Sequence, residues 1–99
     1  MNKKRAEFIY KLPGTIKVRT LTKTSSQAKY ANQPYYKLTI TQGQQPNKTL
    51  QVFENKLTNP LIWTTLQSAQ HGELSKKKFI FHCQNIKGYY HLINWEELN

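Results

Sequence analysis

The stretch TLQVFENKLTNPLIWTTLQ, residues 49–67, decides the fold because its pattern of apolar residues changes halfway along. Residues Thr49 to Glu54 alternate in a way typical of a β-strand with one buried face. Asn59 is then a favourable N-cap, and Pro60 suits the first helical position. Apolar residues recur at helical spacing until a stop at Gly72, which predicts one helix of about three turns. These apolar residues are Leu61, Ile62, Leu66 and Ala69.

Two predicted strands precede this stretch. In YYKLTI, residues 35–40, Tyr36, Leu38 and Ile40 share one face. The opposite face carries Tyr35, Lys37, Thr39 and Thr41. Earlier in the chain, Ile16, Val18 and Thr20 form an apolar face against a largely basic face of Lys17, Arg19 and Leu21. Residues 8–12 can extend this first strand past a bend at Pro13 and Gly14, residues 24–33 read as a long loop, and residues 43–47 as a turn.

Two further strands follow the predicted helix. KKKFIFHCQ, residues 76–84, and YYHLINW, residues 89–95, form a hairpin around a turn at residues 85–88. Phe79, Phe81 and Cys83 are expected to face the core, and His82 to face outward. Trp63 is expected to plug one end of the core, whereas Trp95 suits either the core or a ligand.

The order strand, strand, strand, helix, strand, strand predicts an all-β protein. It is the order of the OB-fold, a five-stranded barrel with one α-helix between strands 3 and 4. An SH3-like barrel ranks second because its strands are shorter and it has no full helix at this position. We expect residues 1–99 to form a single domain with flexible ends at residues 1–7 and 96–99.

The composition favours a small binding module over an enzyme. The hydrophobic fraction of 37% is below the roughly 45–50% of ordinary domains. Twelve aromatic residues nevertheless make a small barrel core feasible. The lone Cys83 suits a reducing compartment, and no apolar run approaches the roughly 18–20 residues of a membrane span. Neither the three histidines nor the five glutamates fall in a metal or catalytic motif, so no metal, cofactor or catalysis is expected.

The positive charge indicates the class of partner. Fifteen Lys and Arg against five acidic residues give a net charge of +10, which favours nucleic acid over an anionic membrane or an acidic protein. A single strand needs cations for its phosphates and flat rings for its bases. The candidates on the outward strand faces, on the long loop and at the hairpin are Lys17, Arg19, Lys23, Lys29, Tyr30, Tyr35, Lys37, Phe53, Lys76, Lys77, Lys78, His82 and Lys87. The run of three lysines is equally consistent with a solvated turn.

Three segments also resemble a known family. Residues 49–67 are similar to the third strand and helix of bacterial single-stranded-DNA-binding proteins, and residues 35–40 to their second strand. ELSKKKFIFHCQNIKGYYHLINWEEL, residues 73–98, resembles their last two strands, and more closely those of short OB-fold relatives such as primosomal PriB and small plastid or cyanobacterial members. The resemblance spans roughly residues 15–97. The long acidic tail of the bacterial proteins and the tryptophan of their third strand have no counterpart in this sequence.

The resemblance implies sequence-independent binding of single-stranded DNA in replication, repair or recombination, with RNA also possible. It further implies a homodimer or homotetramer, replication proteins as partners, and a plastid or bacterial cytoplasm. The candidate interfaces between copies are Phe8, Ile9 and Tyr10, taken to precede the barrel, and an exposed edge of the last two strands. The alternative is a non-enzymatic OB-fold subunit that binds RNA or another protein in a larger assembly.

Overall fold

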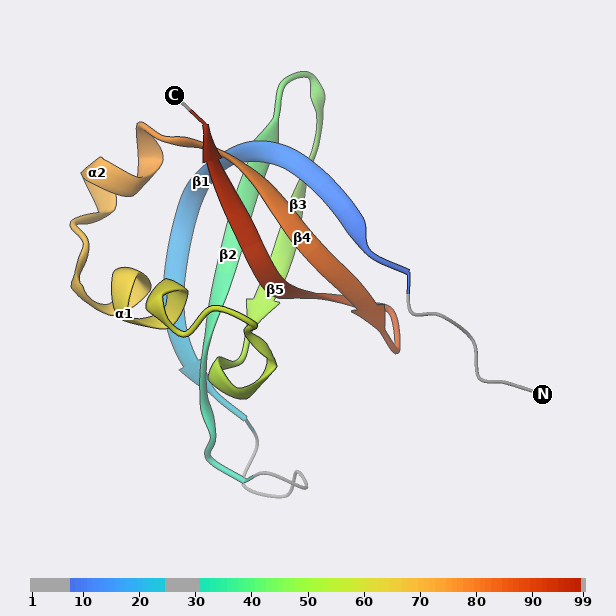
Figure 1. Ribbon diagram of the computed structural model, residues 1–99, viewed down its shortest axis with the longest axis vertical. Helices are drawn as coiled ribbons and strands as arrows, with labels where there is room; N and C mark the ends of the chain where they lie inside the picture. The colour runs from blue at the N-terminus through green and yellow to red at the C-terminus, as the bar shows by residue number, and fades with distance from the viewer. Residues whose placement is uncertain (1–7, 25–30, 99) are drawn as a thin grey trace.

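A closed barrel of five strands encloses the core (Figure 1). The computed structural model describes residues 8–24 and 31–98. The strands are β1 (Tyr10–Lys23), β2 (Pro34–Gln42), β3 (Gln45–Val52), β4 (Lys78–Ile86) and β5 (Tyr89–Leu98). They follow the order β1, β2, β3, β5, β4 around the barrel, and only the short β3–β5 pairing is parallel. This is the strand order of the OB-fold, so the predicted fold class is confirmed.

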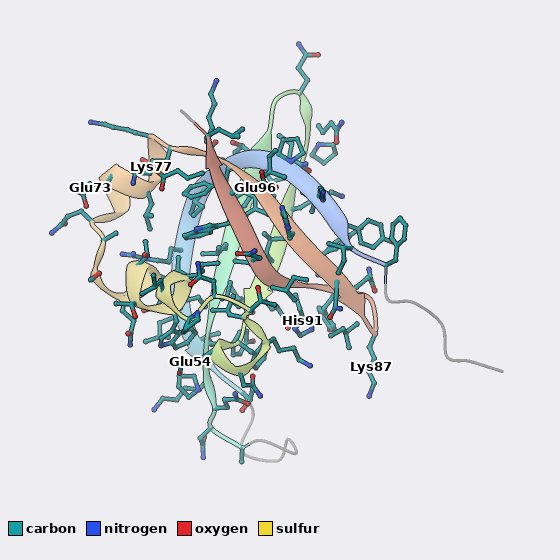
Figure 2. All side chains as sticks on the ribbon, in the orientation of Figure 1. Glu54, Glu73, Lys77, Lys87, His91 and Glu96 are labelled. Carbon is teal, nitrogen blue, oxygen red and sulfur yellow. The ribbon has the colours of Figure 1, made fainter. Side chains whose placement is uncertain are left out.

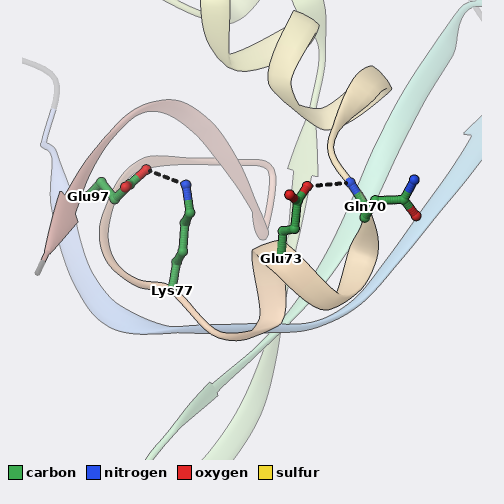
Figure 3. Close-up of polar contacts among 4 residues, drawn as sticks. All are labelled: Gln70, Glu73, Lys77 and Glu97. Carbon is green, nitrogen blue, oxygen red and sulfur yellow. Dashed lines mark hydrogen bonds and ion pairs between the residues drawn. The ribbon is translucent and has the colours of Figure 1, made fainter.

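Three short helical segments connect β3 to β4: η1 (Glu54–Lys56), α1 (Leu61–Ser68) and α2 (His71–Ser75). Asn59 Oδ1 accepts the N–H of Leu61, the first residue of α1, although Pro60 and not Asn59 is the N-cap residue. The prediction of one helix running to Gly72 is wrong, because α1 ends at Ser68 and Gly72 lies inside α2. Glu73 and Gln70 form a capping box that starts α2, and Figure 3 shows its Glu73 Oε1 to Gln70 N hydrogen bond.

The core is built from the inward faces of the strands, one side of α1 and Leu74 of α2. Trp63 is 7% exposed and packs edge-on against Tyr36, so its predicted core position is confirmed. Phe79, Phe81 and Cys83 are fully buried, as predicted, and Trp95 is partly buried with its ring 4.5 Å from that of Phe79. The buried apolar residues are Ile16, Tyr36, Leu38, Ile40, Leu50, Val52, Ile62, Trp63, Leu66, Leu74, Phe79, Phe81, Cys83 and Leu92.

An irregularity in β1 reverses its two faces after Ile16. Ile16 pairs with Ile40 while Val18 pairs with Thr39, so one extra residue is accommodated between them. Val18 is consequently 44% exposed, whereas Arg19 turns toward α1 and donates to the backbone oxygens of Leu66 at 2.7 Å and Ala69 at 2.9 Å. The expectation that Arg19 shares an outward face with the preceding lysine is therefore wrong.

Strand boundaries correct four further expectations. β3 begins at Gln45, earlier than predicted, and includes Pro46. β5 continues through Leu98, so Glu96 and Glu97 belong to a strand and not to a flexible end. Tyr10 does not precede the barrel, because it pairs with Cys83 of β4. That pairing also covers the edge of β4 that had been a candidate interface. The predicted flexible end at residues 1–7 lies outside the described residues.

Candidate nucleic-acid interface

Three aromatic rings stack in a row on the outside of the barrel, and we call Tyr35, Phe53 and His91 the ring stack. The rings of Tyr35 and Phe53 have centroids 4.5 Å apart and planes inclined by only 8°. The rings of Phe53 and His91 are 5.5 Å apart with an inclination of 27°. Tyr36 pairs with Val52, so the neighbouring residues Tyr35 and Phe53 lie on the opposite, outer face of β2 and β3, as the sequence alternation predicted.

Polar side chains continue the same outer face beside the ring stack. Lys37 is exposed two residues along β2 from Tyr35, and it pairs with Gln51 of β3 on one side and Thr20 of β1 on the other. Gln51 in turn pairs with His91 across the parallel β3–β5 contact. One surface therefore combines a cation, hydrogen-bonding groups and stacked rings.

His91 is the most enclosed member of this surface. It is 8% exposed, and its Nδ1 atom has no hydrogen-bond partner. Burial and, secondarily, the positive charge of Lys56 lower the pKa of His91 below its ordinary value of 6.5. The imidazole is therefore neutral at neutral pH, with one nitrogen as donor and the other as acceptor.

Other predicted cations flank this surface. Lys23 is exposed at the end of β1, where the chain enters the loop toward β2. Lys87 projects from the tight β4–β5 turn (Figure 2), where Lys87 and Gly88 both have positive φ. Lys17 is exposed on β1 at the irregularity itself, between Ile16 and Val18. Lys29 and Tyr30, the two predicted loop contacts, lie outside the described residues.

The remaining predicted contacts lie on another part of the barrel. Lys76, Lys77 and Lys78 are exposed where the chain passes from α2 into β4. Lys77 Nζ lies 3.3 Å from Glu97 Oε2 (Figure 3), and His82 Nε2 lies 2.7 Å from Glu96 Oε2. In Figure 2 both Lys77 and Glu96 are well separated from His91. The structure thus brings together Tyr35, Lys37 and Phe53 but not these hairpin residues.

A second aromatic group lies where β1 and β5 begin, near the β4–β5 turn. Phe8 is 71% exposed and packs edge-on against Tyr10, which packs edge-on against Tyr90. Lys48 Nζ lies 5.4 Å from the centroid of the Tyr90 ring. Tyr90 directly precedes His91 in β5, so their side chains point to opposite faces of the strand and this group lies apart from the ring stack.

His91 was missed from the sequence because nothing local distinguishes it from the other histidines. Its place in the ring stack depends on the parallel pairing of β3 with β5, which joins residues 40 positions apart. The one available signal was its position in the alternation of YYHLINW, directly before the buried Leu92.

Comparisons with protein-family models, with curated proteins and with solved structures found no match to this chain. Within residues 8–24 and 31–98, no group of three or more His, Cys, Asp or Glu side chains is placed to hold a metal ion. No helix in the described part of the chain is both long enough and apolar enough to cross a membrane.

Proposed function

We propose that the protein binds single-stranded DNA, largely independently of its sequence, on the outer face of β2 and β3. The observation that carries this proposal is the ring stack with Lys37 on the same face. Flat rings bind bases of any identity, and lysines bind the repeating phosphates, so neither contact requires a particular sequence. The OB-fold supports the proposal further, because this face and the loops beside it are where such barrels bind oligonucleotides.

The two flanking lysines extend the proposed path beyond the sheet. Lys23 lies at the β1–β2 end of the surface and Lys87 at the β4–β5 turn. A strand crossing from one loop to the other passes the ring stack and Lys37 between them. In this arrangement the protein holds the strand and carries out no chemistry on it.

Fluorescence anisotropy tests the proposal with labelled oligo-dT, oligo-U and a DNA duplex of equal length. We expect oligo-dT to bind more tightly than the duplex, because a duplex keeps its bases stacked on one another and away from the rings. Tighter binding of oligo-U would point to RNA instead. Equal or tighter binding of the duplex would contradict the proposal, as would no binding of any nucleic acid, and the latter would favour a protein partner.

Neighbouring tyrosines provide a matched pair of variants. Tyr35→Ala removes an outward ring, so it is expected to weaken binding by about 1–3 kcal/mol without lowering the melting temperature. Tyr36→Ala removes a ring that is 7% exposed, so it is expected to cost about 3–5 kcal/mol of folding free energy. If Tyr35→Ala binds as well as the wild type, the strand does not use this face.

The predicted homo-oligomer is part of the same proposal. The predicted interface between copies included Phe8 and an edge of the last two strands. The barrel is closed, so that edge is paired, but Phe8 is 71% exposed and can contact a second copy. Sedimentation at moderate salt without nucleic acid is expected to show a dimer or tetramer that Phe8→Asp dissociates. If the protein sediments as a monomer at tens of micromolar, the proposed homo-oligomer is wrong. The proposed binding face would be unaffected by that result.

A further inference from the structure

Tyr89 is an exposed aromatic residue on the same face of β5 as His91. Tyr90 between them packs against the core, and the pairing of residues 89–92 with β4 is regular. Side chains alternate along a regular strand, so Tyr89 and His91 both point outward. Their Cα atoms lie about 7 Å apart, because an antiparallel strand rises roughly 3.4 Å per residue. The outer face that carries the ring stack therefore continues along β5 to Tyr89.

The ring of Tyr89 is more open to solvent than any member of the ring stack. Its exposed fraction is 59%, whereas Tyr35 and Phe53 are half-buried and His91 is 8% exposed. Tyr35 and Phe53 also cover part of each other, because their rings are stacked. Within residues 8–24 and 31–98, no second aromatic ring lies against Tyr89. A base therefore finds more uncovered ring surface on Tyr89 than on the ring stack.

The backbone holds Tyr89 directly after a tight turn. Lys87 and Gly88 form this turn with φ of 54° and 88°, and Tyr89 pairs with Ile86 across it. Positive φ at both central residues is the geometry of the short hairpin turns that match the twist of a sheet. Asn85 Oδ1 accepts the N–H of Gly88 at 3.0 Å and fastens the turn further. The backbone of Tyr89 is thus ordered before binding, which lowers the entropic cost of using its ring as a contact.

The same turn places a cation near this ring. Lys87 is exposed and lies two residues before Tyr89, and Figure 2 shows its side chain projecting from the turn. Glu96 and Glu97 lie toward the far end of β5, so neither glutamate of this strand repels a phosphate at the turn. An uncovered ring and a cation at one hairpin tip are the two contacts that a nucleotide of a single strand requires.

We propose that Tyr89 is a further base-stacking residue, which receives one base of the bound strand while Lys87 contacts a phosphate beside it. This inference rests on the proposed function and extends the binding face from β2 and β3 across β5 to the β4–β5 turn. A neighbouring base contacts the ring stack at the same time. The positions of Tyr89 and His91 are about 7 Å apart, twice the roughly 3.4 Å between stacked bases of a duplex strand, so the two bases are held apart from each other, as only a single strand allows.

Two substitutions of Tyr89 test the stacking contact by fluorescence anisotropy with a labelled dT oligomer of about 15 nucleotides. Tyr89→Ala removes the ring and is expected to weaken binding by about five- to 150-fold. Tyr89→Phe keeps the ring and is expected to bind as the wild type does. Leu98→Ala, which truncates a 41% exposed side chain at the far end of β5, is the control and is expected to leave the affinity unchanged. Unchanged affinity of Tyr89→Ala, or an equal loss in Tyr89→Phe, would overturn the stacking role.

Nuclear Overhauser effects in the wild-type complex test the same contact without a variant that must fold. We expect one thymine methyl group of the bound oligomer to show contacts to the Tyr89 ring, and another to show contacts to the Tyr35 ring. Contacts to Tyr35 without any to Tyr89 would overturn the role of Tyr89 although the proposed function stands. Failure of the wild type to bind oligo-dT would overturn the proposed function itself.

Discussion

Arg19 stabilises the end of α1 from a neighbouring strand. The last carbonyls of a helix lack partners within the helix, and the helix dipole places partial negative charge there. The Arg19 guanidinium meets both needs with its two hydrogen bonds to Leu66 O and Ala69 O. Its charge therefore acts within the fold, while the charge of Lys37 points into solvent.

Exchanging each of these cations for methionine separates the two roles. Arg19→Met keeps the aliphatic stem and removes both hydrogen bonds, so it is expected to lower the free energy of unfolding by about 1.5–3 kcal/mol. The same variant should leave the affinity for oligo-dT unchanged at temperatures where it is folded. Lys37→Met is expected to show the opposite pattern, with weaker binding and an unchanged melting temperature. Urea unfolding and anisotropy measure the two effects, and a loss of affinity in Arg19→Met would mean that its charge also contacts the strand.

His91 makes stability depend on pH because its pKa is lowered in the folded protein. In the unfolded chain the imidazole takes up a proton below about pH 6.5, whereas in the folded chain it does so only at a lower pH. Between these two values the unfolded state binds more protons, so the free energy of unfolding rises with pH. The neutral His91 therefore makes its full contribution to the free energy of unfolding above pH 6.5. That contribution is lost as the pH falls from 6.5 through the lower pKa of His91 in the folded protein.

The expected result is a melting temperature that falls between pH 7.5 and pH 5.5 more steeply for the wild type than for His91→Phe. Thermal unfolding followed by circular dichroism measures both curves. Subtracting the variant removes the effect of the carboxylates and of the other histidines. Parallel curves for the two proteins would show that His91 titrates as it does in the unfolded chain.

At the scale of elements, β1 pairs with two strands of the barrel and changes partner at Gly14. Residues up to Gly14 pair with β4, and residues from Thr15 pair with β2. This transfer brings the backbone so close to β2 that a Cβ atom on Gly14 would lie 2.4 Å from Thr41 O. Backbone oxygen cannot move aside as a flexible side chain can, so glycine is required where the barrel closes.

Gly14→Ala is therefore expected to destabilise the fold by about 1–3 kcal/mol, as other substitutions that force backbone shifts do. Gly72→Ala is the matched control, because a Cβ there meets no atom within 4 Å. Gly72 lies inside α2, so alanine is expected to stabilise the helix by about 0.5–1 kcal/mol. Urea unfolding measures the free energy of unfolding of both variants. Equal values for the two would contradict the inference that a Cβ atom on Gly14 is too close to Thr41 O.

The elements that sequence alone predicted are those whose pattern is local. The alternation of Tyr36, Leu38 and Ile40 placed β2 with the correct face inward, and Asn59 placed the start of α1 to within one residue. The reversal in β1 was not predictable, because one extra residue changes no residue type and is visible only in the register against β2. The early end of α1 depended on the side-chain hydrogen bonds of Gln70 and Glu73, which compete with continuation of the helix.

The candidate site divides in the same way. Tyr35 and Lys37 were predictable because they lie on the outward face of β2, and Phe53 because it directly follows β3 and continues its alternation. The position of His91 of β5 in the ring stack was not predictable, because it depends on the pairing of β5 with the distant β3. The hairpin cations were predicted from charge alone, and the sequence gives no sign that Lys77 and His82 lie beside Glu97 and Glu96.

At the scale of the whole molecule, the acidic residues are placed so that they leave most of the candidate interface positive. Glu96 and Glu97 pair with His82 and Lys77 on the β4–β5 hairpin. Glu73 is engaged in the capping box of α2. Among the described acidic residues, Glu54 is the one that adjoins the ring stack in sequence, and the same short segment carries Lys56. The exposed lysines on or beside this interface, Lys23, Lys37 and Lys87, are thus available to a polyanion.

The salt dependence of binding tests this distribution as a whole. Each phosphate that a lysine neutralises on a single strand releases counterions, and the slope of log K against log salt changes by about −0.7 per contact. Four described lysines lie on or beside the proposed path, namely Lys23, Lys37, Lys56 and Lys87. Their combined contacts predict a slope of about −3 for oligo-dT.

Removing one lysine at a time shows where these contacts lie. Lys37→Met is expected to reduce the steepness by about 0.7, whereas Lys77→Met is expected to leave it unchanged because Lys77 already faces Glu97. Anisotropy titrations at several salt concentrations give all three slopes. A wild-type slope near zero would mean that stacking alone holds the strand. A change in the Lys77 variant equal to that in the Lys37 variant would mean that the strand also passes over the β4–β5 hairpin, because an ion pair on the protein surface yields readily to a phosphate.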